Sequence, residues 1–199
     1  SHASKLTVFI QDILNRRKLK VSDLDAISVS KGPGSYTGLR IGVSVAKGLA
    51  YGANLPLIAI NTLQAMACST TQKYQTEKDS DILFCPMIDA RRMEVYVAFY
   101  DNKNNTVKQT SADIIDSNSY LSWLEKYRMV FFGTGAEKCK NTINHRNAEF
   151  IENIYPSAAN MLTLSELAFA EKDFEDVAYF EPFYLKDFIA TKPKSKVLK

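Results

Sequence analysis

The glycine-rich turn at residues 31–36 constrains the fold of this 199-residue chain more than any other feature. An alternating apolar run at 26–30 predicts a strand before the turn, and apolar spacing predicts a helix over 37–52 after it. Backbone N–H groups and the helix dipole converge at such a junction, so it can hold an anion. The junction consists of Gly32, Pro33, Gly34, Ser35, Thr37 and Gly38.

The spacing of these glycines is GxGxxxG, which matches neither the GxGxxG nor the GxxxxGK[ST] phosphate loop. On spacing alone, the pattern therefore favours a tight turn, in which glycine permits positive φ and close packing. An anion site stays the alternative interpretation of the same residues.

The helix predicted over 37–52 carries rows of small side chains. Glycine inside a helix costs roughly 0.8–1 kcal/mol relative to alanine, so its repeated use indicates that another backbone approaches closely. Spacing does not distinguish the chain's own sheet or first helix from a partner protein. One row is Gly38, Gly42, Ala46 and Ala50; a second is Ser44, Gly48 and Gly52; an apolar row is Ile41, Val45 and Leu49.

Helices and strands alternate along the rest of the chain, which predicts an α/β architecture. Further helices are predicted over 4–18, 62–73, 117–127 (capped by Ser117 or Asn118) and 164–172. Further strands are predicted over 56–60, 82–88, 94–100 and 129–132. Residues 179–188 are predicted to form an extended aromatic segment. The apolar stripe of the first helix is Leu6, Phe9, Ile10, Ile13 and Leu14. If that stripe packs on the chain's own sheet, Val8, Gln11 and Asn15 face outwards. A polar stretch at 76–81 separates two predicted lobes, 1–76 and 77–199.

Composition excludes several kinds of function. The net charge of +3 is too balanced for tight autonomous RNA binding. The three cysteines suggest neither disulfides nor a zinc site, and the two histidines, His2 and His145, have no ligand partners at metal spacing. HExxH and GxSxG are both absent. The sequence therefore predicts no catalytic set and no metal site.

The chain shows neither a secretory signal nor an apolar run near the ~20 residues that cross a bilayer. These features and the unpaired cysteines predict a cytoplasmic protein without membrane contact. The basic cluster near the end of the sequence is expected to be a solvated terminus more than an RNA-binding tail. It comprises Lys192, Lys194, Lys196 and Lys199.

Three segments, 28–67, 87–101 and 180–194, resemble the TsaB (YeaZ) family. The most specific is KGPGSYTGLRIG at 31–42, followed by the small-residue helix. The resemblance implies a two-lobed fold of the actin/sugar-kinase/Hsp70 (ASKHA) type. It also implies a non-catalytic scaffold in the bacterial complex that forms N6-threonylcarbamoyladenosine at position 37 of tRNAs that read ANN codons.

In that complex, the resemblance implies that this chain binds and stabilises TsaD and that TsaE, an ATPase, joins the pair. TsaD is expected to catalyse the reaction, so this chain is expected to need no cofactor of its own. ATP and Mg²⁺ are expected to be bound elsewhere in the complex, and the chain is expected to contact tRNA only indirectly. Helices 4–18 and 37–52 are the implied contacts to TsaD, or to a second copy when the chain is alone. The candidate residues are Val8, Gln11, Asn15, Gly38, Ile41, Gly42, Val45, Ala46 and Leu49.

A charged turn between two predicted strands is the remaining candidate site. It contains Asp89, Arg91, Arg92 and Glu94. Charges in such a turn are usually solvated or ion-paired. The family likeness adds the interpretation that they line the interlobe cleft or contact a partner, and arginine also suits phosphate.

Members of this family begin with about 30 residues that have no counterpart here, a strand–turn–strand segment, so we expect an incomplete N-terminal lobe with an unpaired strand edge at 26–30. The main alternative function is a nucleotide-dependent small-molecule kinase of the same superfamily. It requires an aspartate base and complete phosphate loops, and neither is recognisable. A metalloprotease is disfavoured by the histidine count.

Overall fold

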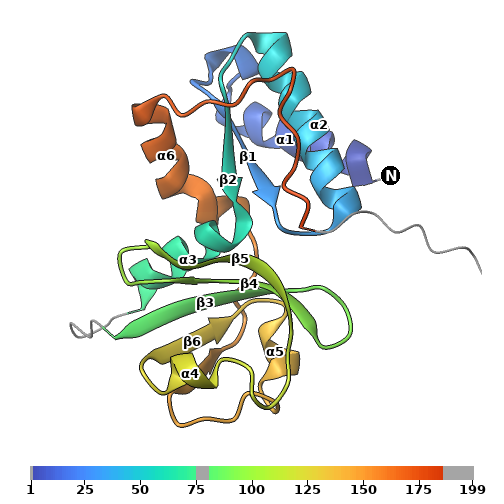
Figure 1. The fold of residues 1–199 in the computed structure, drawn as a ribbon. Helices are drawn as coiled ribbons and strands as arrows, with labels where there is room; N and C mark the ends of the chain where they lie inside the picture. Colours follow the sequence, from blue (N-terminus) through green and yellow to red (C-terminus); the bar gives the residue numbers. More distant parts are fainter. Residues whose placement is uncertain (1, 75–80, 186–199) are drawn as a thin grey trace, which may run out of the picture.

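The computed structural model describes residues 2–74 and 81–185, which form two layered α/β units (Figure 1). The first unit contains two parallel strands, β1 (Ile27–Gly32) and β2 (Leu57–Asn61). Parallel strands need a crossover connection, which α2 (Tyr36–Ala53) supplies. Val43, Ala46 and Ala50 of α2 are buried against the sheet.

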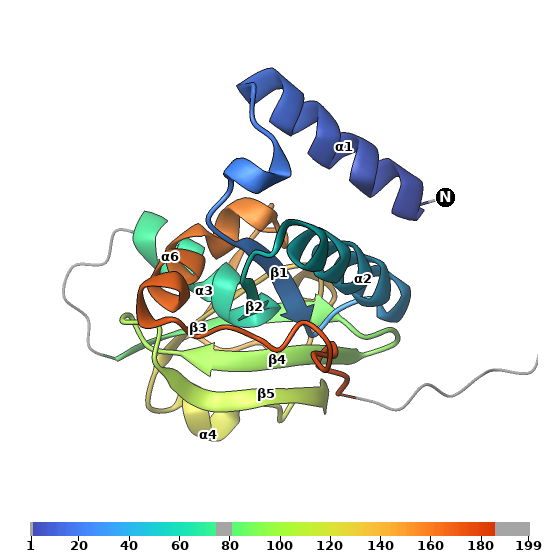
Figure 2. The same cartoon turned by 90° about the horizontal axis from the view of Figure 1, so that it is seen from above.

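Helix α1 (His2–Arg17) lies beside α2 and, as Figure 2 shows, stands away from both sheets. A short 3-10 helix, η1 (Val21–Asp23), connects it to β1. The order of these elements therefore leaves α1 in contact with α2 on one side and open on the other.

The second unit is a mixed five-stranded sheet in the order β5-β4-β3-β6-β7. Its strands are β3 (Ile82–Asp89), β4 (Glu94–Tyr100), β5 (Thr106–Ile114), β6 (Arg128–Phe132) and β7 (Ala148–Ile151). The central strand β3 pairs antiparallel with β4 and parallel with β6. It is buried along nearly its whole length, which explains its continuous apolar run.

Helices cover both faces of this second sheet. Helix α3 (Thr62–Lys73) packs on one face through Leu63, Met66 and Ala67. Two short helices, α4 (Leu121–Leu124) and α5 (Ala136–Cys139), cover the other. Because α3 directly follows β2, it joins the two units.

The chain then returns to the first unit. After the 3-10 helix η2 (Ala158–Met161), helix α6 (Leu162–Glu171) packs on β2 through Leu164 and Ala168. Residues 173–185 continue along the first unit as an irregular segment with a turn at 177–179 (Figure 1). The first sheet is thus covered by segments from both ends of the sequence. A division of the chain at residue 76 stays a prediction.

Most of the predicted elements are confirmed with small shifts in their ends: both helices of the candidate interface, the strands over 26–30, 56–60, 82–88, 94–100 and 129–132, and the helices over 62–73 and 164–172. Strands β5 and β7 were not predicted. Of the segment predicted to be extended over 179–188, Tyr179 lies in a turn and 180–185 contain no helix or strand. Residues 186–188, the polar stretch at 76–80, the side chain of His2 and the Lys192–Lys199 cluster lie outside the described residues.

The predicted helix over 117–127 is wrong, because only the four-residue α4 forms there. The carboxylate of Asp116 accepts hydrogen bonds from the N–H of Asn118 and the hydroxyl of Ser119, which builds a turn instead of a helix cap. Tyr120 then takes a left-handed conformation with φ of 64°. Side-chain hydrogen bonds of this kind compete with helix formation.

Candidate partner-binding surface and interlobe pocket

The predicted outward residues of α1 are exposed. Val8 is 55% exposed, and Gln11 and Asn15 follow it at helical spacing on the same face. The Gln11 Nε2 donates a hydrogen bond of 2.9 Å to the Asn15 Oδ1. These three side chains form one continuous face that points away from the rest of the described chain.

Only part of the apolar stripe of α1 packs internally. Leu14 is buried and Leu6 and Ile10 are half-buried, but Phe9 and Ile13 are each 61% exposed. The physical reason is that α1 stands beside α2 instead of lying flat on a sheet. Helix α1 therefore presents large apolar side chains to its surroundings.

The small residues of α2 divide between two faces. Ala46 and Ala50 lie in the chain's own core, so Ala46 is not part of the exposed surface. Gly38, Ser44 and Gly48 are exposed. A Cβ built at Gly42, Gly48 or Gly52 would meet no atom within 4 Å. The interpretation of packing on the chain's own sheet is therefore confirmed for Ala46 and Ala50, and a partner contact stays a prediction for the exposed residues.

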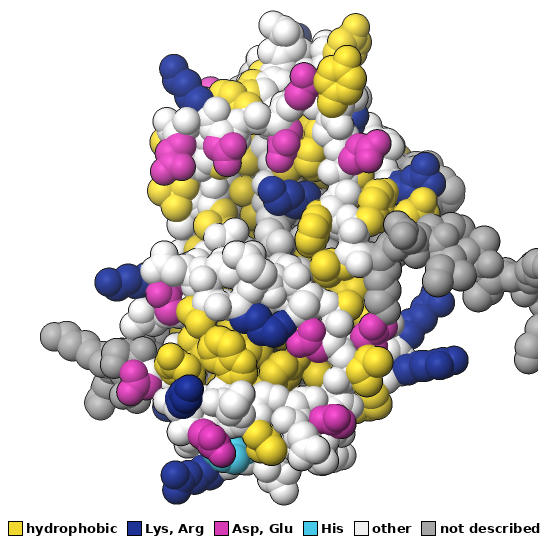
Figure 3. All heavy atoms as spheres, in the orientation of Figure 1, with side chains coloured by type: hydrophobic (Ala, Val, Ile, Leu, Met, Phe, Trp, Pro, Cys, Tyr) yellow, Lys and Arg dark blue, Asp and Glu magenta, His cyan; other side chains and the backbone are white. Residues whose placement is uncertain are grey.

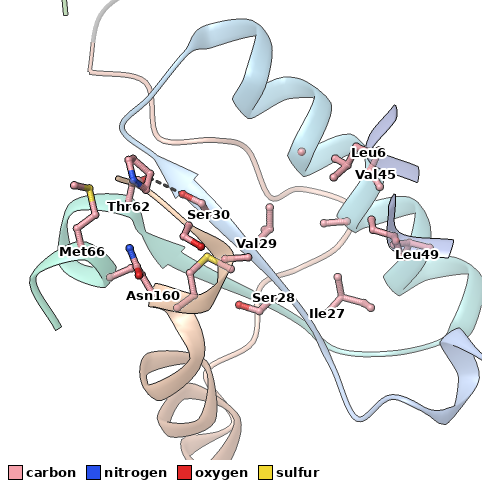
Figure 4. A pocket seen from close by; sticks show the side chains of 18 residues that line it. Leu6, Ile27, Ser28, Val29, Ser30, Val45, Leu49, Thr62, Met66 and Asn160 are labelled. Carbon is pink, nitrogen blue, oxygen red and sulfur yellow. Dashed lines mark hydrogen bonds between the residues drawn. The ribbon is translucent and has the colours of Figure 1, made fainter. Parts of the chain in front are cut away.

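The apolar row of α2 borders a groove between the two helices and β1. Ile41, Val45 and Leu49 are half-buried. Val45 and Leu49 line a cavity of about 430 Å³ together with Leu6 and Ile10 of α1 (Figure 4). Residues 27–30 of β1 form its floor, and among the described strands none pairs with that edge of β1.

The glycine-rich turn is packed against a distant part of the chain. Gly32 has φ of +111°, and a Cβ there would lie 2.8 Å from the carbonyl oxygen of Phe183. Ser35 caps α2, because its hydroxyl accepts a hydrogen bond of 3.3 Å from the N–H of Gly38. The predicted tight turn is thus present, and its first glycine is required by a close backbone approach.

The turn and the charged segment after β3 meet in a polar pocket between the two units, with a volume of about 580 Å³. One wall is made by Pro33, Gly34, Ser35 and Thr37, and the opposite wall by residues 88–91, including Asp89 and Arg91. Residues 183–185 complete the lining. Arg92 and Glu94, which were predicted with Asp89, lie outside this lining.

The ammonium of Lys138 on α5 holds the charged turn. It donates hydrogen bonds to the Asp89 carboxylate and to the carbonyl oxygens of Arg92 and Glu94. The hydrogen bond from Lys138 lowers the pKa of Asp89 below its ordinary value. Arg91 and Arg92 have positive φ, so the turn is tight. Lys138 was missed in the sequence because no motif marks it.

Other candidate chemistry is sparse in the described residues. No group of three or more His, Cys, Asp and Glu side chains is arranged to hold a metal in residues 2–74 and 81–185. Cys68, Cys85 and Cys139 are free and buried, and burial raises the pKa of each thiol. The Nδ1 of His145 accepts a hydrogen bond from the N–H of Asn147. None of the described helices is long and apolar enough to cross a bilayer.

Comparison with known families and structures defines the class of this protein. The family model "TsaD: tRNA N6-adenosine threonylcarbamoyltransferase" matches residues 1–194. A crystal structure described as an uncharacterized protein with similarity to peptidase YEAZ, from Pseudomonas aeruginosa, superposes with a TM-score of 0.77 at 25% identity, covering 94% of this chain and 85% of that one. The structure of YeaZ from the same organism has a TM-score of 0.73 at 25% identity, covering 92% of this chain and 85% of that one. The two-lobed α/β fold is therefore of the ASKHA type.

Proteins of similar sequence identify the family within this class. The chain is 30% identical to the tRNA threonylcarbamoyladenosine biosynthesis protein TsaB of Escherichia coli (strain K12) over 96% of its length and 83% of that protein. It is 32% identical to TsaB of Bacillus subtilis (strain 168) over 94% of its length and 80% of that protein. The tRNA N6-adenosine threonylcarbamoyltransferase of Paracoccus denitrificans matches at 45%, but over only 34% of this chain and 19% of that enzyme. The chain belongs to the TsaB (YeaZ) family.

Proposed function

We propose that this chain is a non-catalytic scaffold subunit in the formation of N6-threonylcarbamoyladenosine on tRNA, where it binds and stabilises TsaD and where TsaE joins the pair. The names of its relatives support the pathway. The observation that carries the scaffold role is the open face of α2, on which Gly48 and its neighbour Ser44 are exposed and a Cβ at position 48 would meet nothing.

The exposed face of α2 suits close approach of another helix. Glycine in a helix costs roughly 0.8–1 kcal/mol relative to alanine, and no described contact within the chain requires glycine at position 48. A partner backbone in van der Waals contact is an interaction that offsets this cost. The adjacent helix α1 exposes the apolar side chains of Val8, Phe9 and Ile13, which a partner could bury. The proposed interface therefore combines α1 and α2.

A second copy of the chain is the proposed occupant of the same surface when TsaD is absent. The faces of α1 and α2 are adjacent, so one patch made of both helices can serve both copies in an isologous two-fold interface. Gly48→Leu is then expected to weaken both the homodimer and the TsaD complex. Light scattering of the isolated protein tests the first part.

The chemistry is proposed to belong to TsaD, and the ATP and Mg²⁺ to the complex. In the interlobe pocket, Asp89 is the one carboxylate among the described lining residues, and Lys138 holds it with a lowered pKa. A general base works best with a pKa near the operating pH. The contact with Lys138 therefore disfavours Asp89 as the aspartate base that the alternative small-molecule kinase would require.

Contact with tRNA is proposed to be indirect. The net charge is +3, and on the face shown in Figure 3 the basic side chains are dispersed over both units instead of forming one patch. Phosphate-dominated affinity requires many neutralising contacts in one footprint. TsaD is therefore expected to supply most of the tRNA-binding surface.

Reconstitution of the modification tests this function. The chain, TsaD and TsaE from the same genome are mixed with tRNA, ATP, Mg²⁺ and threonylcarbamoyl-adenylate, and modified nucleoside is measured by mass spectrometry. We expect product in the complete mixture, a large loss when the chain is omitted, and none with the chain alone. Product from the chain alone would show that it is catalytic, and full product without it would show that it is dispensable.

A further inference from the structure

Residues 173–185, here called the C-terminal strap, are anchored on the first unit by their first half. Glu175 pairs with Leu57 at the outer edge of β2, and its N–H donates a hydrogen bond of 2.8 Å to the Leu57 carbonyl oxygen. Phe180 is buried in the core under α2. The ammonium of Lys47 on α2 donates to the carbonyl oxygens of Ala178 and Phe180, at 3.1 and 3.0 Å. This half of the strap is part of the core.

The second half of the strap, residues 181–185, lies on the glycine-rich turn with lighter contacts. The Phe183 N–H donates a hydrogen bond of 2.7 Å to the carbonyl oxygen of Lys31. The ring of Tyr184 lies 5.1 Å from that of Tyr36. Phe183 and Tyr184 are 41% and 38% exposed. Phe180 belongs to the buried core cluster under α2, whereas the rings of Phe183 and Tyr184 are only partly buried. Residues 181–185 are therefore expected to open more readily than the anchored half.

These contacts reach the start of α2 directly. Tyr36 is the first residue of α2. Its ring contacts the ring of Tyr184, and the Arg40 guanidinium lies 5.2 Å from the Tyr36 ring centroid and donates to the Tyr36 hydroxyl at 3.1 Å. At the start of the 31–36 turn, the Lys31 carbonyl oxygen accepts the hydrogen bond from Phe183, and a Cβ at Gly32 would meet the Phe183 carbonyl oxygen. The strap end therefore fixes both sides of the junction from which α2 begins.

We propose that residues 181–185 act as a latch that sets the position of the α2 N-terminus for partner binding. With the latch closed, the 31–36 turn and the first turn of α2 are held in the geometry described here. With the latch open, the turn loses its backbone hydrogen bond and its ring contact, and the first turn of α2 gains conformational freedom. Ordering that first turn on binding then costs conformational entropy, which lowers affinity. This inference rests on the proposed function, because it takes α2 as part of the TsaD interface.

Two variants open the latch by different routes. Gly32→Ala places a Cβ against the carbonyl oxygen of Phe183 at a position whose φ is +111°. Tyr184→Ala removes the ring against Tyr36 without altering the turn, and so carries the test if the first variant does not fold. The matched control is Tyr179→Ala, which removes a ring of the same kind that is 84% exposed on the anchored half of the strap.

The experiment measures latch opening and partner affinity separately. Hydrogen exchange of the Phe183 amide reports the hydrogen bond to Lys31, and calorimetric titration with TsaD reports affinity. We expect the opening variants to speed exchange about tenfold and to weaken TsaD binding about tenfold, and the control to do neither. Faster exchange with unchanged affinity would overturn the coupling, and unchanged exchange in both opening variants would overturn the latch. If the wild-type chain does not bind TsaD, the proposed function fails together with the latch. If wild type binds TsaD but the opening variants leave either hydrogen exchange or affinity unchanged, only the latch is overturned.

Discussion

One side chain, Lys138, joins α5 to Asp89 and so holds the turn between β3 and β4 at both ends. Its ammonium donates to the Asp89 carboxylate and to the carbonyl oxygens of Arg92 and Glu94, the latter two at 2.6 and 2.8 Å. A lysine ammonium has three donors, and all three are used. The pocket wall formed by Asp89 and Arg91 therefore owes its shape to a residue outside the pocket.

Replacing Lys138 with methionine keeps the stem and removes these hydrogen bonds. We expect the free energy of unfolding to fall by about 1–2 kcal/mol, since hydrogen bonds to charged groups are stronger than neutral ones but solvent reaches this site. Urea denaturation measures the change. The control is Lys140→Met, because the Lys140–Glu152 ion pair is largely exposed and is expected to contribute little. Equal losses in the two variants would contradict the role given to Lys138.

The same contact predicts a dependence on pH. Lys138 lowers the pKa of Asp89, so the ionised carboxylate is favoured in the folded state. The resulting stabilisation is present above the pKa of the unfolded chain, about 4 for aspartate, and is lost as pH falls through the lowered folded value. We expect the stability difference between wild type and Lys138→Met to be full at neutral pH and to shrink below about pH 4. NMR titration of the Asp89 carboxyl carbon should show its pKa rising in the variant; no change would contradict the assignment.

The anchored half of the strap is expected to be a large contributor to stability. Phe180 is 8% exposed and packs with Leu57 and Val43. Phe180→Ala is expected to lower the free energy of unfolding by about 3–5 kcal/mol, the usual cost of removing a buried ring. Phe174→Ala, which removes a ring that is partly exposed on the same segment, should cost clearly less. Thermal or chemical unfolding of the two variants distinguishes the two positions.

Sequence pattern was sufficient where local rules operate. The strand–turn–helix unit around the glycines was predictable because the turn chemistry and the helical spacing agree with the final packing. The helix predicted over 117–127 was wrong because the hydrogen bonds that the Asp116 side chain accepts compete with helix formation. Strand β5 was missed because it lies at the edge of the sheet and is only partly buried, so apolar alternation is weak.

Contacts between distant segments were beyond prediction from the pattern. Gly32 was identified as a turn residue, but its neighbour Phe183 lies about 150 residues away and no periodicity links them. The same holds for Lys138 and the turn at Asp89. The exposure of Val8, Gln11 and Asn15 could be predicted, because it follows from helical geometry once the apolar stripe is assigned. Ala46 was misplaced because two faces of α2 both carry small residues.

Substitutions at Gly48 are expected to affect the stability of the isolated chain and its affinity for TsaD in opposite directions. Its Cβ position is open, so Gly48→Ala should raise the free energy of unfolding by up to about 1 kcal/mol, and Gly48→Leu by a similar amount. Both effects are measurable by urea denaturation of the isolated protein. A loss of stability in either variant would show that position 48 is packed within the chain.

Calorimetric titration of TsaD into wild type, Gly48→Ala and Gly48→Leu tests the scaffold interface most directly. A complex is expected for wild type, with affinity reduced slightly by alanine and at least tenfold by leucine, because a large side chain separates the two helix backbones. Stability and affinity would then change in opposite directions at one residue. Absence of binding by wild type at tens of micromolar, or equal affinity of wild type and the leucine variant, would contradict an interface built on the open face of α2.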